Sequence, residues 1–556
     1  MAQGGEGREL SQSDVRGEPP AVEDTMALTP QAARAPEGSG RHGGGRRGGP
    51  RKTEQRGPRR RVLRWSATVL TVVILGTAGA GYLYYQHLNG NIQKGRRSNG
   101  DDKAQRTRPN AAGQTPLNIL LIGSDSRNSD ENVKLGGAKY DRGSPPLADV
   151  QMLIHLSADR KSAAMVSIPR DTRVDIPKCT DPDTGKVYPA TNAIINTTLA
   201  RGGAGCTLST WENLTGVYID HWMTIDFAGV VKMADAIGGV EVCVRQNVWD
   251  HSTPAQRGGS GLKMKAGRKK VEGVQALQWL RTRHAWGSDV MRARAQHMYL
   301  NSMIRTLKQQ NVFTDTGRLM DLAEAATKSL KVSEEIGTVK KLYDLGTELK
   351  SVPADRITSV TMPNVEDAQN GEHVVPEKAG ADKLWQMLRD DVPFDKNGKP
   401  SGAKKGAGTS QPTKTPSVDA ARLGVLVQNA TQSSTEAAAV GRAGTVSQAL
   451  VQKGYGRATA DTSASLSADR TVVRYPSADL AGDAQAVAKA LGIPMSQVKQ
   501  STDVSGVTVV VGADWRTGTA YPKKSAPKAG DLPGGSDAIN GSDTSQCMDV
   551  YKPYQW

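Results

Sequence analysis

The sequence lacks the motifs that identify several common enzyme classes. Its 556 residues include four cysteines and eight histidines, and neither set has the spacing of a zinc site. In particular, there is no HExxH pattern, so the histidines are interpreted as structural. The sequence also contains no GxxxxGK[ST] loop, which disfavours a P-loop nucleotide-binding protein. The histidines considered are His155, His221, His284 and His297.

The first 60 or so residues have almost no large apolar side chains and are rich in Gly, Pro, Arg and Glu. Such a segment cannot bury enough surface to fold, and we predict that it is disordered. The formal net charge of +16 would suit a nucleic-acid partner, but much of the excess is local. Ten Lys or Arg residues and one acid, Glu54, lie between Arg41 and Arg64. We interpret this block as a signal for membrane topology and expect no nucleic-acid partner.

Residues 65–85 carry no formal charge and are long enough to cross a membrane as a helix. Trp65 at one end, and three tyrosines at the other, fit the aromatic belts of the two interfaces. The positive-inside rule then places residues 1–64 in the cytoplasm and everything after Tyr85 outside. A cleaved signal peptide is the alternative, because residues 78–80 (AGA) resemble a cleavage site. The long leader and the long apolar span favour an uncleaved signal anchor in the cell membrane.

All four cysteines follow the predicted membrane span. An even number of cysteines in an oxidising compartment favours disulfides, and four cysteines allow three pairings. Cys179 and Cys206 bracket one loop-rich segment, so we predict that they pair with each other. That pairing leaves Cys243 and Cys547 as the remaining pair.

After a polar tether at residues 86–115, apolar runs typical of strands alternate with patterns typical of helices up to residue 392. We predict an α/β domain over residues 116–392, with helices layered on a central mixed sheet. A Gly/Lys/Pro/Ser-rich linker follows at residues 393–418. A second, smaller α/β domain is predicted at residues 419–514. The tail, residues 515–556, is polar, and we expect it to be mostly disordered. The predicted strands of the first domain are 118–123, 151–156, 163–168 and 240–244, and its main helices are 207–214, 229–237, 274–284, 292–310, 318–330 and 336–349.

Charged side chains gather next to several of the predicted strands. The run NILLIG leads directly to Asp125 and Arg127, and the carboxyl end of a strand is where open α/β sheets bind ligands. Asp149 stands just before another strand. Further along, Arg292 and Gln296 are four residues apart, so they share a helix face. The complete set is Asp125, Arg127, Asp149, Arg170, Asp171, Arg281, Arg283, Asp289, Arg292 and Gln296.

These residue types suit a phosphate group and a metal ion. Guanidinium groups bind phosphate oxygens in pairs, and two carboxylates can hold Mg²⁺ while waters and substrate complete its octahedron. Arginines and Mg²⁺ together stabilise charge in phosphoryl transfer. For any single arginine, a surface ion pair is the alternative. The whole set at strand ends favours a phosphate site.

Four collinear segments resemble the signature segments of the LytR-CpsA-Psr family: NILLIGSDSR, SIPRDTRVDIP, residues 219–244 and QALQWLRTRH with SDVMRARAQ. The resemblance covers about residues 117–311. It implies an α-β-α sandwich with a hydrophobic tunnel for a polyprenyl chain. It also implies transfer of a glycopolymer from a polyprenyl-pyrophosphate carrier to peptidoglycan. LGVLVQNAT and VTVVVGADW in the second domain resemble the LytR C-terminal module.

The resemblance implies a role for each matching residue. Asp125 and Asp149 would hold Mg²⁺, while Arg127 and Arg170 would face the pyrophosphate. Asp171 lies beside this cradle and is a candidate catalytic base. Arg281, Arg283, Arg292 and Gln296 would complete the cradle for the substrate. The chain departs from the family pattern at Leu147, Met291 and Ala295, where arginine, glycine and arginine are usual, and Arg294 stands one position from the last of these.

The sequence therefore predicts a membrane-anchored, extracytoplasmic phosphotransferase. A muramic-acid hydroxyl would attack the phosphorus that bears the glycan, and polyprenyl phosphate would leave. The alternative is a non-catalytic wall-associated protein that binds polyprenyl lipid or glycan in assembly or regulation. The missing arginines favour that alternative.

Overall fold

The computed structural model describes residues 59–556, apart from 103, 108, 111, 137–141, 255, 311–314, 399–413, 433–436, 463–465, 469 and 523–526. Most of the predicted cytoplasmic segment and most of the predicted linker lie outside these residues. The cysteines, the predicted site residues and nearly all of both α/β domains lie within them.

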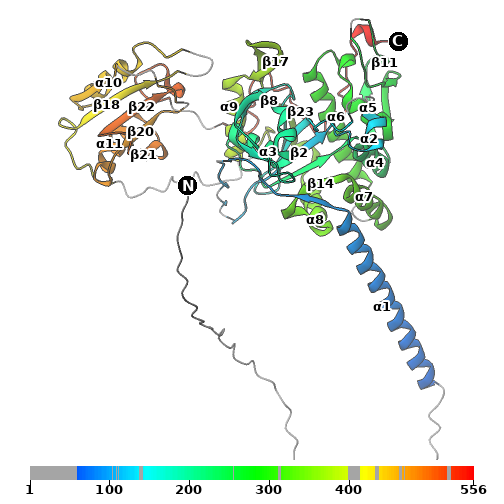
Figure 1. Cartoon of the computed structure of the whole chain (residues 1–556). Helices are drawn as coiled ribbons and strands as arrows, with labels where there is room; N and C mark the ends of the chain where they lie inside the picture. The colour runs from blue at the N-terminus through cyan, green and yellow to red at the C-terminus, as the bar shows by residue number, and fades with distance from the viewer. Residues whose placement is uncertain are drawn as a thin grey trace, which may run out of the picture. The chain divides into compact units, whose positions relative to one another are not determined.

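Helix α1 (Arg59–Asn91) contains the predicted membrane span (Figure 1). Its stretch Leu63–Asn91 has a mean hydropathy of 1.6, and side chains such as Leu70 and Ile74 are exposed. A helix of this length and composition can cross a membrane. Among the described residues it is the one helix that meets this criterion.

The predicted tether does not remain separate from the first domain. After α1, Ile92 is buried against Val332 and Ile336, and strand β1 (Gln93–Gly95) pairs in parallel with β14 (Leu330–Ser333). The indole of Trp222 also donates to the carbonyl of Arg96 at 3.0 Å. The strand has the sequence QKG, which shows no apolar pattern, and the sequence therefore predicted only a polar connection.

The first domain is built on an eight-stranded mixed sheet in the order β1-β14-β9-β2-β3-β4-β15-β23. Central strand β2 pairs antiparallel with β3 and parallel with β9, while β4 pairs parallel with β15. The mixed α/β architecture predicted from the sequence is confirmed. The remaining strands of this sheet are β2 (Leu117–Ser124), β3 (Ala148–Leu156), β4 (Ala163–Ser167), β9 (His221–Ile225), β15 (Ile357–Thr361) and β23 (Ile539–Asn540).

Helices cover both faces of this sheet (Figure 1). Successive side chains of a strand point to opposite faces, and in β2 Leu120 packs with α3 and α9 while Ile119 packs with α6 and α8. Both layers are therefore set by one alternating strand sequence. The helices are α3 (Thr198–Thr215) and α9 (Lys378–Arg389) on one face, and α4 (Phe227–Ile237), α5 (Gly273–Arg281), α6 (Asp289–Gln309), α7 (Thr316–Ser329) and α8 (Val339–Ser351) in the rest of the domain.

The first domain also contains shorter helices and strands outside the main sheet. Helix α2 (Asp130–Gly136) follows the end of β2, and short antiparallel pairs lie outside the main sheet. They are β5 (Arg173–Ile176) with β8 (Thr191–Ile194), β6 (Cys179–Thr180) with β7 (Val187–Tyr188), β10 (Val240–Val244) with β13 (Gly267–Val271), β11 (Val248–Trp249) with β12 (Lys263–Met264), and β16 (Asn364–Asp367) with β17 (Asn370–Pro376).

The second domain has its own five-stranded sheet, in the order β19-β18-β22-β20-β21, and its own core. Val427 and Val509 of the central strands are fully buried beneath Val446 and Leu450 of a helix. Its elements are β18 (Gly424–Ala430), α10 (Arg442–Gln452), β19 (Arg457–Ala460), β20 (Val472–Tyr475), α11 (Ala481–Leu491), β21 (Val498–Gln500) and β22 (Val507–Gly512).

The C-terminal tail corrects the prediction of a mostly disordered segment. Strand β23 pairs antiparallel with β15, and Met548, Val550 and Tyr554 are buried in the core of the first domain. Apolar residues are sparse in the tail and follow neither a helical nor a strand period. Their burial depends on partners far away in the sequence, which a local pattern does not reveal.

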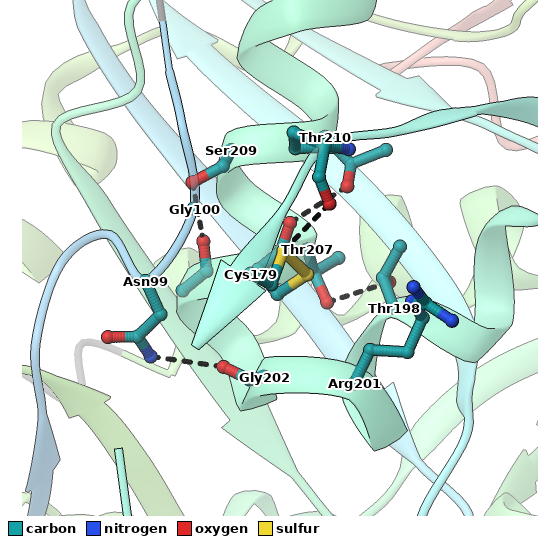
Figure 2. Close-up of a disulfide and its surroundings, with 12 residues drawn as sticks. Asn99, Gly100, Cys179, Thr198, Arg201, Gly202, Thr207, Ser209 and Thr210 are labelled. Atoms are coloured by element: carbon teal, nitrogen blue, oxygen red, sulfur yellow. Dashed lines mark hydrogen bonds between the residues drawn. A yellow bond between two sulfur atoms is a disulfide. The ribbon is translucent and has the colours of Figure 1, made fainter. Parts of the chain in front are cut away.

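Two disulfides are present. Cys179–Cys206 joins β6 to α3, and Cys243–Cys547 joins β10 to the tail. Around the first, Asn99 donates to the carbonyl of Gly202 at 3.0 Å, and the hydroxyls of Thr198 and Thr207 lie 2.9 Å apart (Figure 2). A Cβ at Gly202 would lie 2.9 Å from Cβ of Cys206, so the helix needs a glycine where the disulfide crosses it.

Candidate active site

A large apolar cavity lies in the first domain. It encloses about 1240 Å³ of empty space, including space open to solvent, between β2, β3 and β9 and helices α4, α5 and α6. Its apolar lining includes Met152, Met223, Phe227, Met233 and Leu300. Long flexible methionines and branched aliphatic side chains of this kind suit an extended hydrocarbon chain.

A polar pocket adjoins the apolar cavity. Asp149, Arg281 and Arg292 line both spaces, so charged groups stand where the two spaces meet. The polar pocket encloses about 600 Å³ of empty space. Its other lining residues are Arg170, Arg283, Asp250, Gly259, Ser260 and His284.

Asp125 stands at the end of β2, as the sequence predicts. Its carboxylate accepts a hydrogen bond from the backbone N–H of Leu147 at 2.6 Å, which ties it to the segment before β3. Burial raises the pKa of Asp125, and the neighbouring carboxylate of Asp149 raises it further. The two acids are therefore close enough to repel each other.

Arg170 is the centre of an ion-pair network. Its guanidinium lies 2.9 Å from Asp149, 3.5 Å from Asp171 and 3.8 Å from Asp289. Burial by itself lowers the pKa of Arg170, but the three carboxylates outweigh burial and the pKa is raised. Asp289 also pairs with Arg292 at 2.8 Å, so the network links the end of β4 to the first turn of α6.

Arg281, which is half-buried, and Arg292, which is buried, are cations with incomplete compensation. Arg281 donates to the carbonyl of Leu135 at 2.9 Å and lies 4.6 Å above the ring centroid of Phe227. Burial, and then the positive charge of Arg127, lowers the pKa of Arg281, and burial lowers the pKa of Arg292. A bound anion would offset both effects.

Gln296 lines the apolar cavity and donates to the carbonyl of Leu280 at 3.0 Å. This bond ties α6 to the last turn of α5, which carries Arg281. Arg283 follows α5, and its exposed side chain lines the polar pocket. Five of the predicted residues therefore come from four separate segments and line the polar pocket: Asp149, Arg170, Arg281, Arg283 and Arg292. Asp125, Arg127, Asp171 and Asp289 are not among its described lining residues.

The structure explains the departures from the family pattern. Ala295 is fully buried, and its neighbour Arg294 points to the tail, where it pairs with Asp537 and donates to Gln546 at 2.5 Å. Arg294 therefore does not replace the charge that Ala295 lacks. Met291 packs against an apolar cluster, and Leu147 contributes its backbone N–H to Asp125.

Sequence reasoning missed four residues of the polar pocket, namely Asp250, Gly259, Ser260 and His284. Asp250 is almost fully buried and accepts from the backbone N–H groups of Ser260 at 2.7 Å and Ala285 at 3.2 Å. It therefore holds the loop after β11 against the segment that carries Arg283 and His284. His284 was assigned a structural role, yet it adjoins Arg283 in the RTRH motif, which was an available signal. Asp250 and Ser260 had no comparable signal.

Asp125 and Asp149 are the predicted ligands of a divalent cation. Among the described residues no group of three or more His, Cys, Asp or Glu side chains could hold a metal ion. The charge of Asp149 contributes to the raised pKa of Asp125, after burial. A cation between them would relieve their repulsion, with waters and a phosphate filling the remaining positions.

The sequence model of the LytR_cpsA_psr family matches residues 82–390, which is more than half of the chain. The chain belongs to the LytR_cpsA_psr family. In this family member, residues 422–515 match a second model, described as LytR cell envelope-related transcriptional attenuator.

Several proteins are similar to this family member. The cell wall biosynthesis protein LcpA of Corynebacterium glutamicum is 28% identical over 56% of this chain, and the match covers 61% of LcpA. The polyisoprenyl-teichoic acid–peptidoglycan teichoic acid transferase TagT of Bacillus subtilis is 24% identical over 55% of this chain and 89% of its own length. The structure of a LytR-Csp2A-Psr enzyme from Actinomyces oris matches with a TM-score of 0.38 and 19% identity, over 53% of this chain and 96% of that one.

The chain spans less than two thirds of the length of the first curated relatives. The matches cover 61% of LcpA and also 61% of the probable cell wall biosynthesis protein LcpB of C. glutamicum.

Proposed function

We propose that the protein is a membrane-anchored ligase that transfers a glycan phosphate from a polyprenyl-pyrophosphate carrier to peptidoglycan. One observation carries the proposal: an apolar cavity meets an arginine-lined pocket, and they share Asp149, Arg281 and Arg292. A ligand that fits both spaces has a long hydrocarbon tail and an anionic head. A polyprenyl pyrophosphate has both.

The two parts of the site hold the two parts of this donor. The apolar cavity takes the prenyl chain, and each buried methylene contributes about 0.8 kcal/mol. The pyrophosphate lies against Arg281 and Arg292, the two arginines that line both spaces. Arg170 and Arg283 line the same polar pocket as further donors, and Arg127 is close enough for its charge to act on Arg281.

Asp125 and Asp149 are the residues that would hold Mg²⁺. When bound there, the ion supplies positive charge to the phosphate oxygens. Without it, Asp149 relies on Arg170 for neutralisation. Asp149 and Arg170 thus form an ion pair that joins the start of β3 to the segment after β4, and Asp125 adds a further negative charge nearby.

The reaction is a displacement at phosphorus. The muramic-acid hydroxyl oxygen forms a bond to the phosphorus that bears the glycan, and the bond from that phosphorus to the bridging oxygen breaks. Polyprenyl phosphate leaves with the bridging oxygen and its electron pair. The hydroxyl proton passes to a base, for which Asp171, 3.5 Å from Arg170, is the candidate. The arginines stabilise the developing charge.

The membrane orientation is part of the proposal. α1 is preceded by a basic segment, so the positive-inside rule places the N-terminus in the cytoplasm and both α/β domains outside. The relatives named as cell wall biosynthesis proteins and as a teichoic acid–peptidoglycan transferase support a site of action at the wall.

The test uses the full-length protein in detergent. A labelled polyprenyl-pyrophosphate glycan is mixed with peptidoglycan, with and without Mg²⁺, and label in the insoluble wall fraction is measured. We expect transfer that depends on the protein and on Mg²⁺. Binding of the lipid without transfer would instead support a non-catalytic role in assembly or regulation. The ion pair of Arg294 with Asp537 of the tail favours that alternative, because it keeps this arginine away from the substrate.

A further inference from the structure

The C-terminus lies close to β11 (Figure 1), and four aromatic rings gather there. We call Trp249, His251, Tyr554 and Trp556 the aromatic platform. The rings of Trp249 and His251 are stacked with centroids 4.2 Å apart, and the ring of His251 meets that of Tyr554 edge-on at 5.8 Å. The ammonium group of Lys263 lies 4.7 Å from the ring centroid of Trp249 and 4.8 Å from that of Trp556.

The two tryptophans of the platform are open to solvent. Trp249 is 40% exposed and Trp556 is 48% exposed. Exposed apolar groups that lie side by side on a surface are typical of an interaction site. The ammonium group of Lys263 covers part of both rings.

The platform is held rigidly, although it includes the last residues of the chain. The Cys243–Cys547 disulfide anchors the tail, and the indole of Trp556 donates to the carbonyl of Val248 at 3.0 Å. The hydroxyl of Tyr554 donates to Gln256 at 2.9 Å. Rings fixed in this way lose little conformational entropy when a ligand binds.

The platform is continuous with the polar pocket. The ring of Tyr554 lies 6.1 Å from that of His284, which lines the pocket beside Arg283. His251 follows Asp250, another residue of the pocket lining. A chain that leaves the pocket past His284 therefore meets the platform next.

We propose that the aromatic platform binds the glycan strand of peptidoglycan, the acceptor of the transfer. The C–H groups on one face of a sugar ring carry partial positive charge, and they stack on the negative face of an aromatic ring. The inference rests on the proposed function and specifies where its second substrate binds.

The geometry of displacement favours the acceptor over the donor glycan. The leaving polyprenyl phosphate belongs to the apolar cavity, and the nucleophile of such a reaction enters in line with the leaving oxygen, from the other side. The polar pocket extends away from the residues that it shares with the cavity, toward Asp250 and His284. The platform lies at that end, where the acceptor hydroxyl enters.

The experiment measures binding by the full-length protein in detergent. The probes are soluble glycan strands from peptidoglycan stripped of attached glycopolymer and, separately, polyprenyl pyrophosphate and the same lipid carrying a glycan. The variants are Trp249→Ala, Trp556→Ala and Trp249→Phe. Tyr343→Ala is the matched control, because Tyr343 lies on α8 and is 42% exposed. Melting temperatures and mapping of the Cys243–Cys547 pair establish that each variant is folded.

We expect each alanine variant to weaken strand binding by about three- to tenfold, with polyprenyl-pyrophosphate binding unchanged. Trp249→Phe should bind nearly as well as the wild type, because it keeps a ring. Equal strand binding by both alanine variants and the wild type, or no strand binding by the wild type, would overturn the proposal. So would variants that lose affinity only for the lipid-linked glycan, since the platform would then serve the donor.

The outcome is separable from that of the proposed function. If the wild type transfers glycan and its alanine variants bind strands normally, the ligase activity is supported and the role of the platform is contradicted. Strand binding that depends on the platform, without any glycan transfer, would support the platform and contradict the ligase activity.

Discussion

At the residue scale, the arginines of the polar pocket differ in what surrounds them. Arg292 is 7% exposed and paired with Asp289, whereas the side chain of Arg283 is exposed at the rim. A substitution of Arg283 therefore tests substrate binding with little effect on folding, because most substitutions of exposed residues change the free energy of unfolding by about 0.5 kcal/mol or less.

We predict that Arg283→Lys slows glycan transfer by about ten- to a hundredfold, since a charge-assisted bond is worth about 1.5–3 kcal/mol and lysine cannot reproduce a two-pronged contact. The melting temperature should stay the same. Arg318→Lys on α7, whose ion pair with Asp315 is exposed, is the control. An unchanged rate for Arg283→Lys would remove this residue from the substrate site.

Asp125 combines burial with a second carboxylate nearby, and both raise its pKa. We predict that Asp125→Asn abolishes Mg²⁺-dependent transfer and Mg²⁺ binding measured by calorimetry, because an amide supplies no charge to the ion. Thermal stability should be equal or higher, since the substitution removes a carboxylate that burial disfavours. Asp149→Asn should also stop transfer. Wild-type rates in both variants would exclude these acids from the mechanism.

At the element scale, the junction between the membrane helix and the sheet contains a buried acid. Glu212 of α3 accepts from Arg97 at 3.0 Å and from the backbone N–H of Ile219 at 2.7 Å. Burial raises the pKa of Glu212 to about 7, and the nearby carboxylate of Asp102 adds to the rise. The folded protein therefore binds a proton at this carboxyl more tightly than the unfolded chain does.

A raised carboxyl pKa stabilises the fold at low pH, and the contribution is lost as the pH rises from about 4.5 through about 7. We predict that the wild type loses up to about 3 kcal/mol between pH 5 and pH 8 from this group. Glu212→Gln should lose less over the same range. Thermal unfolding of both proteins at several pH values measures the difference. Parallel curves would show that Glu212 stays charged throughout.

The tail is the second element with a testable role, because β23 and the Cys243–Cys547 disulfide join it to the first domain. We predict that Cys243→Ser with Cys547→Ser destabilises the domain by about 2–5 kcal/mol and exposes the tail to protease. Cys179→Ser with Cys206→Ser should affect α3 and leave the tail protected. If the tail of the Cys243→Ser, Cys547→Ser variant resists protease, its other contacts are enough to hold it on the first domain.

At the scale of the whole molecule, the second domain lies in the sequence between two parts of the first. Residues before 393 and the ordered tail both contribute to the same core, in which Trp279 and Trp286 pack near Met548 and Tyr554. The second domain is therefore an insertion between them rather than a terminal appendage.

The orientation in the membrane is also a property of the whole molecule. We predict that protease added to intact, wall-stripped cells digests both α/β domains, because the basic charge precedes α1. A cytoplasmic protein in the same cells serves as the control for intact membranes. Digestion only after permeabilisation would reverse the orientation.

The sequence by itself determined the features that depend on local order. Helix α1 follows from one uncharged run, the alternation of β2 from the run NILLIG, and the candidate donors from motifs next to strand ends. Each of these is readable because the period of a helix or strand, or the spacing of a motif, is a property of neighbouring residues.

Only the tertiary structure decided the features that join distant residues. It turned Arg294 toward Asp537, brought Asp250 and His284 into the polar pocket, and enclosed the apolar cavity beneath α4. The tail shows the reason most clearly. Its buried residues are too sparse to form a pattern, and their burial comes from a strand and a disulfide partner that lie far away in the sequence.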